Sequence, residues 1–121
     1  EFRKFCRQSA TLRNTLFHYT HYIIEQLAQT VLCNRFHSVQ ERLSRCLLTA
    51  RDRIGSDYLP LTRDVLATMT GARRPRISTI LTKLAGKGLI RGSRGAIMIT
   101  DPQELINLAC DCYRIMKAHL E

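Results

Sequence analysis

Acidic residues are missing from a long stretch of this sequence. Between Val65 and Thr100 there is no Asp or Glu, and the charged residues there are all cationic: Arg73, Arg74, Arg76, Lys83, Lys87, Arg91 and Arg94. The whole chain of 121 residues carries a formal net charge of +9. Such a surface suits a polyanion, because each phosphate that it neutralises releases bound counterions. The charge by itself also allows an alternative interpretation, a solvated basic face that has no partner.

Long apolar runs are also missing. No run approaches the roughly 18 residues that a membrane-spanning helix needs, and the N-terminal EFRKFCRQS lacks the apolar core of a signal peptide. We therefore expect a cytoplasmic protein without membrane contact. The chain does not begin with Met and starts in a charged, helix-like stretch, so we expect a fragment of a longer protein.

The motifs of common enzymes are absent as well. The sequence has no Gly-rich phosphate loop and no nucleophile paired with a base at a recognisable spacing. Cys33 and His37 lie four residues apart, but no third group is placed to orient them. We predict no catalytic residues and no enzymatic activity.

Cysteine is present five times, without a C-x-x-C pair or the Cys/His spacing of a zinc site: Cys6, Cys33, Cys46, Cys110 and Cys112. We interpret these residues as reduced, partly buried apolar side chains, with a thiol switch as the alternative. Cys110 and Cys112 are two apart, so on one helix they would point to different faces. For His18, His21 and His37 we expect packing or solvent exposure. We predict no metal site and no cofactor in this part of the protein.

The stretch LTRDVLATMTGARRPRISTILTKL, residues 61–84, predicts two short amphipathic helices joined by a turn at Gly71. Thr62 is a suitable N-cap for the first helix, and Gly71 tolerates the left-handed backbone at its end. Two short helices joined by a turn with Gly are typical of domains that read DNA.

A long helix is expected before this motif. Residues 2–8 predict a short helix, Ser9 is a suitable N-cap, and residues 10–34 contain no Pro or Gly. One apolar line on the long helix comprises Leu12, Leu16, Tyr19, Ile23, Leu27 and Val31, and a second comprises Phe17, Ile24 and Ala28. We predict that the first line meets the same helix of a second subunit and that the second packs on its own chain. A helix buried on both sides within a monomer is the alternative.

The remaining segments complete a small domain. Ser38 and Glu41 have the spacing of a capping box, so a helix should start there and end at Gly55, with Arg45 on its outer face. Residues 89–91 and 96–100 flank a Gly-rich turn and predict a β-hairpin with Arg94 at its tip. Asp101 and a following Pro should cap a final helix that runs past Cys112. The expected fold is mainly α with a small β-hairpin: a long helix followed by a winged helix-turn-helix domain.

The order of these parts resembles the C-terminal half of the Crp–Fnr family of bacterial transcription regulators, most specifically in residues 61–84 and in the wing GLIRGSRGAIMIT. The resemblance implies that residues 1–36 are the end of a sensor domain and a dimerisation helix, and that residues 37–121 bind double-stranded DNA. It further implies a homodimer on a pseudo-palindromic operator and RNA polymerase as a partner of the full-length protein. Any effector would bind an N-terminal sensor barrel, which is missing here. A winged-helix module for non-specific DNA binding or protein contacts is the alternative.

The resemblance also assigns DNA-binding residues. Thr62 and Arg63 match phosphate-contacting positions, and Arg74 matches an Arg that reads guanine in many members. The full predicted set is Thr62, Arg63, Arg73, Arg74, Arg76, Ser78, Thr79, Lys83 and Arg94. Many members have Ser at the position of Arg73 and Glu at that of Pro75, so the operator preference cannot be transferred. Because a residue before Pro is pushed away from helical geometry, we expect Arg74 to be the cap and the helix to start one residue late.

Overall fold

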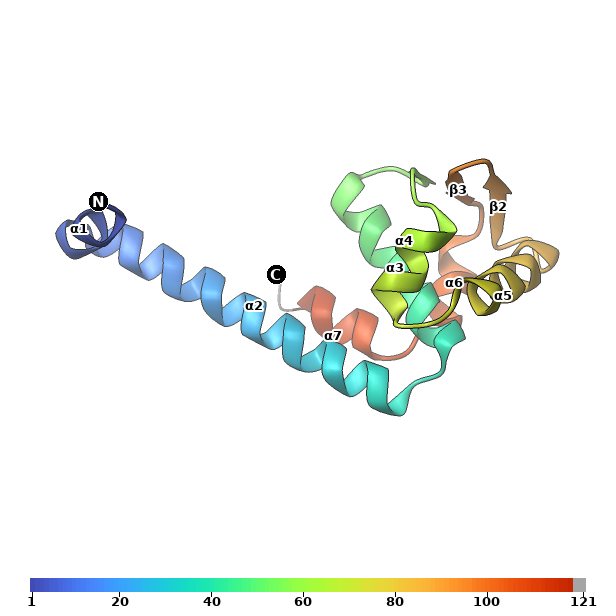
Figure 1. The fold of residues 1–121 in the computed structure, drawn as a ribbon, viewed down its shortest axis with the longest axis horizontal. Helices are drawn as coiled ribbons and strands as arrows, with labels where there is room; N and C mark the ends of the chain where they lie inside the picture. The colour runs from blue at the N-terminus through green and yellow to red at the C-terminus, as the bar shows by residue number, and fades with distance from the viewer. Residues whose placement is uncertain (119–121) are drawn as a thin grey trace.

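A computed structural model describes residues 1–118 and confirms the predicted fold class. The elements in chain order are α1 (Phe2–Gln8), α2 (Ala10–Phe36), α3 (Val39–Ile54), β1 (Tyr58–Leu59), α4 (Arg63–Thr70), α5 (Arg74–Gly86), β2 (Ile90–Ser93), β3 (Ala96–Ile99), α6 (Pro102–Leu108) and α7 (Cys112–Ala118). Helix α2 extends away from a compact body that contains all elements from α3 onward, and α1 folds back at its far end (Figure 1). None of the described helices is long and apolar enough to cross a membrane.

The helix ends follow local sequence signals. The Ser9 hydroxyl accepts a hydrogen bond from the Leu12 N–H at the start of α2, and His37 caps its end. Ser38 and Glu41 form the predicted capping box, since each side chain accepts from the other residue's backbone N–H. Gly55 ends α3 with a φ of 75°, a conformation that strongly favours glycine.

One hydrophobic core joins the elements of the compact body. Its fully buried large side chains come from α3, β1, α4, α5 and α6: Leu43, Leu47, Leu48, Leu59, Leu66, Ile77, Leu84 and Leu105. Burying a leucine side chain contributes about 1.5–3 kcal/mol. The core therefore holds the two helices of the motif firmly against α3 and the sheet.

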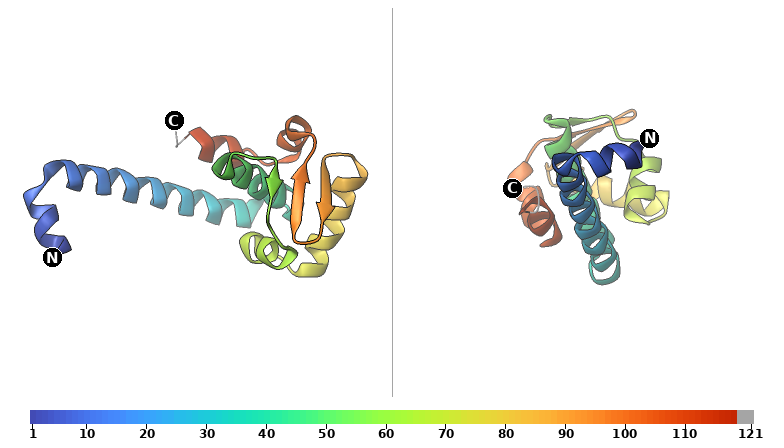
Figure 2. Two further views of the ribbon diagram at one scale, coloured as in Figure 1. Left: turned by 90° about the horizontal axis from the view of Figure 1, so that it is seen from above. Right: turned by 90° about the vertical axis from the view of Figure 1, so that its left-hand side faces the viewer.

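The predicted hairpin forms, and it gains a third strand. The sheet order is β1-β3-β2, fully antiparallel, with Ile90 opposite Ile99 and Tyr58 opposite Met98. The three strands lie side by side next to α5 (Figure 2). The third strand, β1, forms because the Leu59 side chain fills the core while its backbone pairs with β3.

The predicted packing of α2 on its own chain is wrong. Of the second apolar line, Phe17 is 71% exposed and Ile24 is 58% exposed, which also excludes a helix buried on both sides within the single chain. Helix α2 instead packs against α7 with a third, largely polar face. The Gln26 side chain there donates to the Met116 carbonyl, and Gln29 donates to Cys112 Sγ.

The final helix is broken into α6 and α7. Ala109 has an extended backbone (φ −72°, ψ 154°), so the chain turns before Cys112 and α7 lies along α2 (Figure 1). Helix α7 also packs against the outer face of α3. Arg45, which we placed on the outside, is consequently only 5% exposed.

Candidate nucleic-acid interface

The helix-turn-helix is built by the predicted caps and a shared apolar face. The Thr62 hydroxyl accepts from the Val65 N–H at 3.2 Å, and Gly71 ends α4 with a φ of 71°. Leu66 of α4 and Ile77 of α5 are both fully buried. Since α5 turns its apolar face inward, its polar face is left on the surface of the body.

Helix α5 starts earlier than we expected. Arg73 occupies the N-cap position and makes no side-chain cap, and Arg74 is already the first helical residue. The N–H that Pro75 lacks would have no intrahelical acceptor in the first turn, so proline is tolerated there. The helix therefore begins with uncapped amides and the positive end of its dipole, next to cationic side chains.

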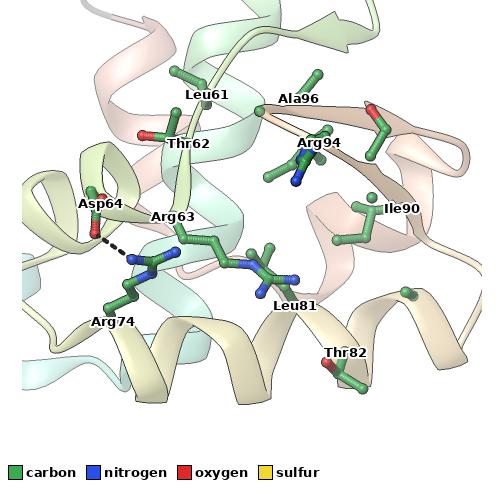
Figure 3. A pocket seen from close by; sticks show the side chains of 15 residues that line it. Leu61, Thr62, Arg63, Asp64, Arg74, Leu81, Thr82, Ile90, Arg94 and Ala96 are labelled. Atoms are coloured by element: carbon green, nitrogen blue, oxygen red, sulfur yellow. Dashed lines mark ion pairs between the residues drawn. The ribbon is translucent and has the colours of Figure 1, made fainter.

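A groove of about 680 Å³ lies between the start of α4, the side of α5 and the wing formed by β2 and β3. The side chains of Arg63, Arg74 and Arg94 reach it from these three elements (Figure 3). The same groove is lined by Thr62 at the start of α4. Cationic groups from three separate elements thus surround one channel, which is a suitable shape for an anionic backbone.

One carboxylate reaches this surface. Asp64 Oδ1 lies 3.6 Å from Arg74 Nη1, and both side chains are largely exposed. Arg63 and Arg94 form no ion pair with any residue of the described range 1–118. Because an exposed pair contributes little stability, Arg74 is available to another anion at small cost.

The other predicted residues do not line the groove: Arg73 is the N-cap of α5, and the rest lie on α5 itself. Arg73, Arg76, Thr79 and Lys83 are exposed, and Ser78 is half-buried. The Thr79 hydroxyl donates to the Pro75 carbonyl at 3.0 Å, which leaves its oxygen free to accept.

Three polar residues that line the groove were not predicted from the sequence: Asp64, Thr82 and Ser93. Thr82 lies three positions after Thr79, so helical spacing could have predicted that both residues lie on the same face of α5.

Comparisons with known proteins agree on the domain. Residues 41–108 match the Crp-like helix-turn-helix domain. No curated protein matches the chain.

Solved structures share the fold, among them the following three. FixK2 from Bradyrhizobium japonicum has a TM-score of 0.83 at 19% identity over 89% of this chain and 57% of that chain. A CooA mutant from Carboxydothermus hydrogenoformans has a TM-score of 0.80 at 16% identity, over 90% and 54% of the two chains. A transcriptional regulator of the Crp/Fnr family from Eubacterium rectale has a TM-score of 0.72 at 23% identity, over 88% and 50%.

The chain spans about half the length of these solved structures. They establish the fold of the long helix and the winged domain together, while the match over residues 41–108 covers more than half of the sequence. The chain therefore belongs to the family of proteins with a Crp-like helix-turn-helix domain.

Proposed function

We propose that this chain is the dimerisation and DNA-binding part of a transcription regulator that reads a pseudo-palindromic operator as a homodimer. The observation that carries the proposal is the groove where Arg63, Arg74 and Arg94 converge beside the exposed face of α5. Helix α5 would enter the major groove, with Arg74 reading a base edge. Arg94 on the wing and Thr62 and Arg63 at the start of α4 would contact the flanking phosphates.

The exposed apolar residues of α2 support the homodimer. Tyr19, Leu27 and Val31 of the proposed dimer line are 62%, 61% and 67% exposed, and Leu12, Leu16 and Ile23 are half-buried. A contiguous apolar strip of this kind is unusual on a monomer and marks an interface. A helix of 27 residues, about 40 Å long, offers enough length for a two-stranded coiled coil.

The proposed activity involves no chemical step by this chain. It would act by binding DNA in the cytoplasm and, in the full-length protein, by contacting RNA polymerase. An effector would bind outside this part of the protein. These proposals follow from the family and from the resemblance described above.

Selection from a randomised duplex pool at about physiological salt tests the proposal directly. We expect enrichment of an inverted repeat whose half-site centres are about 10 base pairs apart, or a multiple of this. The variant R74A should then lose about 5- to 150-fold in affinity for the selected site and relax its preference at one base position. R94A should weaken binding to all duplexes alike. It should also reduce the steepness with which the logarithm of the binding constant falls with the logarithm of salt concentration by about one.

Arg53→Ala is the matched control, because Arg53 lines a separate cavity beside α2 and α7. It removes the same charge without touching the groove and should leave site preference unchanged. If no sequence is enriched, and R74A weakens every duplex equally, the chain is a basic module that does not read sequence.

A further inference from the structure

Four side chains with metal-binding atoms meet where α2 joins the compact body. The atoms come from Cys33, His37, Cys110 and Cys112, and all four lie within 4.8 Å of one another. Cys33 Sγ is 3.5 Å from Cys110 Sγ, and Cys112 Sγ is 3.4 Å from His37 Nδ1. In a tetrahedral zinc site with Zn–S near 2.3 Å and Zn–N near 2.0 Å, neighbouring ligand atoms are about 3.5–3.8 Å apart. Two of the pairs therefore already have the spacing of a mononuclear site, and the whole set would need only a small contraction to surround one ion.

The broken C-terminal helix creates this arrangement. Cys110 lies in the turn after α6 and Cys112 is the first residue of α7, so the two thiols face the same point instead of opposite sides. Cys33 lies in the last turns of α2, and His37 caps that helix. The set is hard to recognise in the sequence, because the residues in contact are far apart along the chain. Cys33 is 77 positions from Cys110, and His37 is 75 positions from Cys112.

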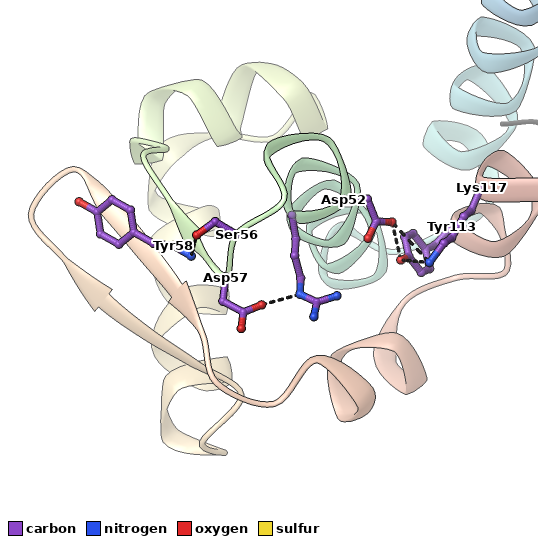
Figure 4. Close-up of polar contacts among 7 residues, drawn as sticks. Asp52, Ser56, Asp57, Tyr58, Tyr113 and Lys117 are labelled. Atoms are coloured by element: carbon purple, nitrogen blue, oxygen red, sulfur yellow. Dashed lines mark hydrogen bonds and ion pairs between the residues drawn. The ribbon is translucent and has the colours of Figure 1, made fainter. Parts of the chain in front are cut away.

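Both halves of the cluster are held in place. The Tyr113 hydroxyl donates to Asp52 Oδ2 at 2.7 Å, and Lys117 approaches the same carboxylate, which fixes α7 on α3 (Figure 4). The guanidinium of Arg42 donates to the carbonyls of His37 and Thr70, which ties the end of α2 to α4. A site whose ligands are positioned before the ion arrives loses little entropy on binding.

The surroundings are those of a closed structural site. Cys33, Cys110 and Cys112 are at most 5% exposed. Gln29 Nε2 donates to Cys112 Sγ at 3.1 Å, the kind of contact that orients a metal ligand from outside. Four protein ligands leave no open coordination position for catalysis.

Arg45 is a buried cation whose charge a metal site would balance. It is 5% exposed, its Nε has no hydrogen-bond partner, and it forms no ion pair with a carboxylate of residues 1–118. The groups near its guanidinium are sulfur atoms: Met116 Sδ lies 3.7 Å from Nη1, and the thiols of Cys33, Cys46 and Cys110 are close enough to interact with it. A buried cation without an anion is costly. Zn²⁺ with three thiolates and a neutral imidazole carries one net negative charge, which this buried guanidinium would offset.

We propose that Cys33, His37, Cys110 and Cys112 bind one Zn²⁺ ion that fastens α2 to α7. On binding, the ion replaces the three thiol protons, which pass to the solvent, and no other bond changes. Thiolates with imidazole in a tetrahedral set favour zinc over hard cations. An iron–sulfur cluster would need its ligands farther apart, around a cage of several atoms. The proposal differs from our sequence-based expectation of no metal site and of cysteines that serve as reduced, partly buried apolar side chains.

Metal analysis of the whole 121-residue chain, purified under reducing conditions with added Zn²⁺, tests the proposal. We expect one zinc ion per chain. The variants C110S and C112S should bind Zn²⁺ at least about 100-fold more weakly, since even the loss of an outer contact costs 10- to 100-fold. C6S is the matched control, because Cys6 lies in α1 at the far end of α2, and it should retain zinc fully.

Replacing Zn²⁺ by Co²⁺ in the unaltered chain gives a readout that does not depend on a variant's folding. Tetrahedral cobalt bound to thiolates has intense visible absorption and a sulfur-to-metal charge-transfer band. A chain that binds no zinc, cobalt without these bands, or equal zinc loss in C6S and C110S would overturn the proposal. Recovery of a Cys33–Cys110 disulfide from reduced, zinc-supplied protein would do so as well.

Discussion

At the scale of single residues, one acidic side chain among residues 1–118 lines the groove, and the other charged side chains there are basic. Asp64 lies 3.6 Å from Arg74 and lines the groove with it. Its charge opposes the approach of a phosphate and competes for the guanidinium. Asp64 is therefore expected to limit affinity rather than to add to it.

The variant D64N tests this expectation. It should bind duplex DNA several-fold more tightly at low salt, and the gain should shrink as salt rises, because the interaction is screened over about 8 Å at 0.15 M ionic strength. The measurement is a salt titration of binding by fluorescence anisotropy. Glu104→Gln removes the same charge from an exposed position on α6 outside the groove and should have a smaller effect. Weaker binding by D64N would show that the pair positions Arg74 for DNA instead.

Residue-scale prediction worked where a local signal existed. Thr62, Gly71 and the exposed cations could be placed because capping and charge depend on neighbours in sequence. Arg45 could not, because its burial depends on α7 covering α3, which local periodicity does not show. The three clustered thiols were missed for the same reason.

At the scale of elements, the capping box of α3 makes a pH-dependent contribution to stability. The hydrogen bond from the Ser38 backbone N–H to Glu41 lowers the pKa of this carboxyl group, and the Ser38 hydroxyl and His37 act in the same direction, while partial burial opposes them. A lowered pKa in the folded state means that ionised Glu41 stabilises the fold. This stability is present above the ordinary glutamate pKa and is lost as the pH falls through the lowered value.

Glu41→Gln should remove this part of the acid sensitivity. Glutamine can still accept the capping hydrogen bond, but it does not titrate. As the pH falls below the ordinary glutamate pKa, the thermal midpoint of the variant should consequently fall less steeply than that of the parent chain. Near neutral pH, the two midpoints should change with pH at nearly the same rate. If the thermal midpoints of the variant and the parent chain fall in parallel across the acidic pH range, Glu41 does not contribute through its charge.

Elements with strong caps were predictable, whereas their packing was not. The bounds of α2, α3 and α4 follow Ser9, Ser38 and Thr62, and the wing follows its Gly-rich turn. The break between α6 and α7 has no Pro or Gly at Ala109 to announce it. The choice of the Gln26 and Gln29 face for packing on α7 likewise depends on tertiary hydrogen bonds.

At the scale of the whole molecule, the proposed homodimer depends on the exposed side of α2. Leu27→Glu places a charge in the centre of the apolar line, where the residue is 61% exposed in the single chain. The folded protomer should tolerate this change, but a coiled-coil seam should not, because the charge would be buried against its own copy. Sedimentation analysis should show a shift from dimer to monomer. Asn14→Glu, on the opposite helical face, should leave the dimer intact.

The proposed zinc site lies between the dimer helix and the DNA-binding body, so zinc binding would affect how the proposed dimer holds its two DNA-binding domains. If α2 orients two winged domains for paired half-sites, a loosened joint should reduce binding to the full operator and leave single half-site binding almost unchanged. Removing Zn²⁺ with a chelator should therefore weaken full-operator binding by about 100-fold or more, the lost gain from effective concentration. C6S should behave like the parent chain. If the chelator weakens binding to the full operator and to a single half-site equally, the metal stabilises the winged domain itself rather than its position relative to α2.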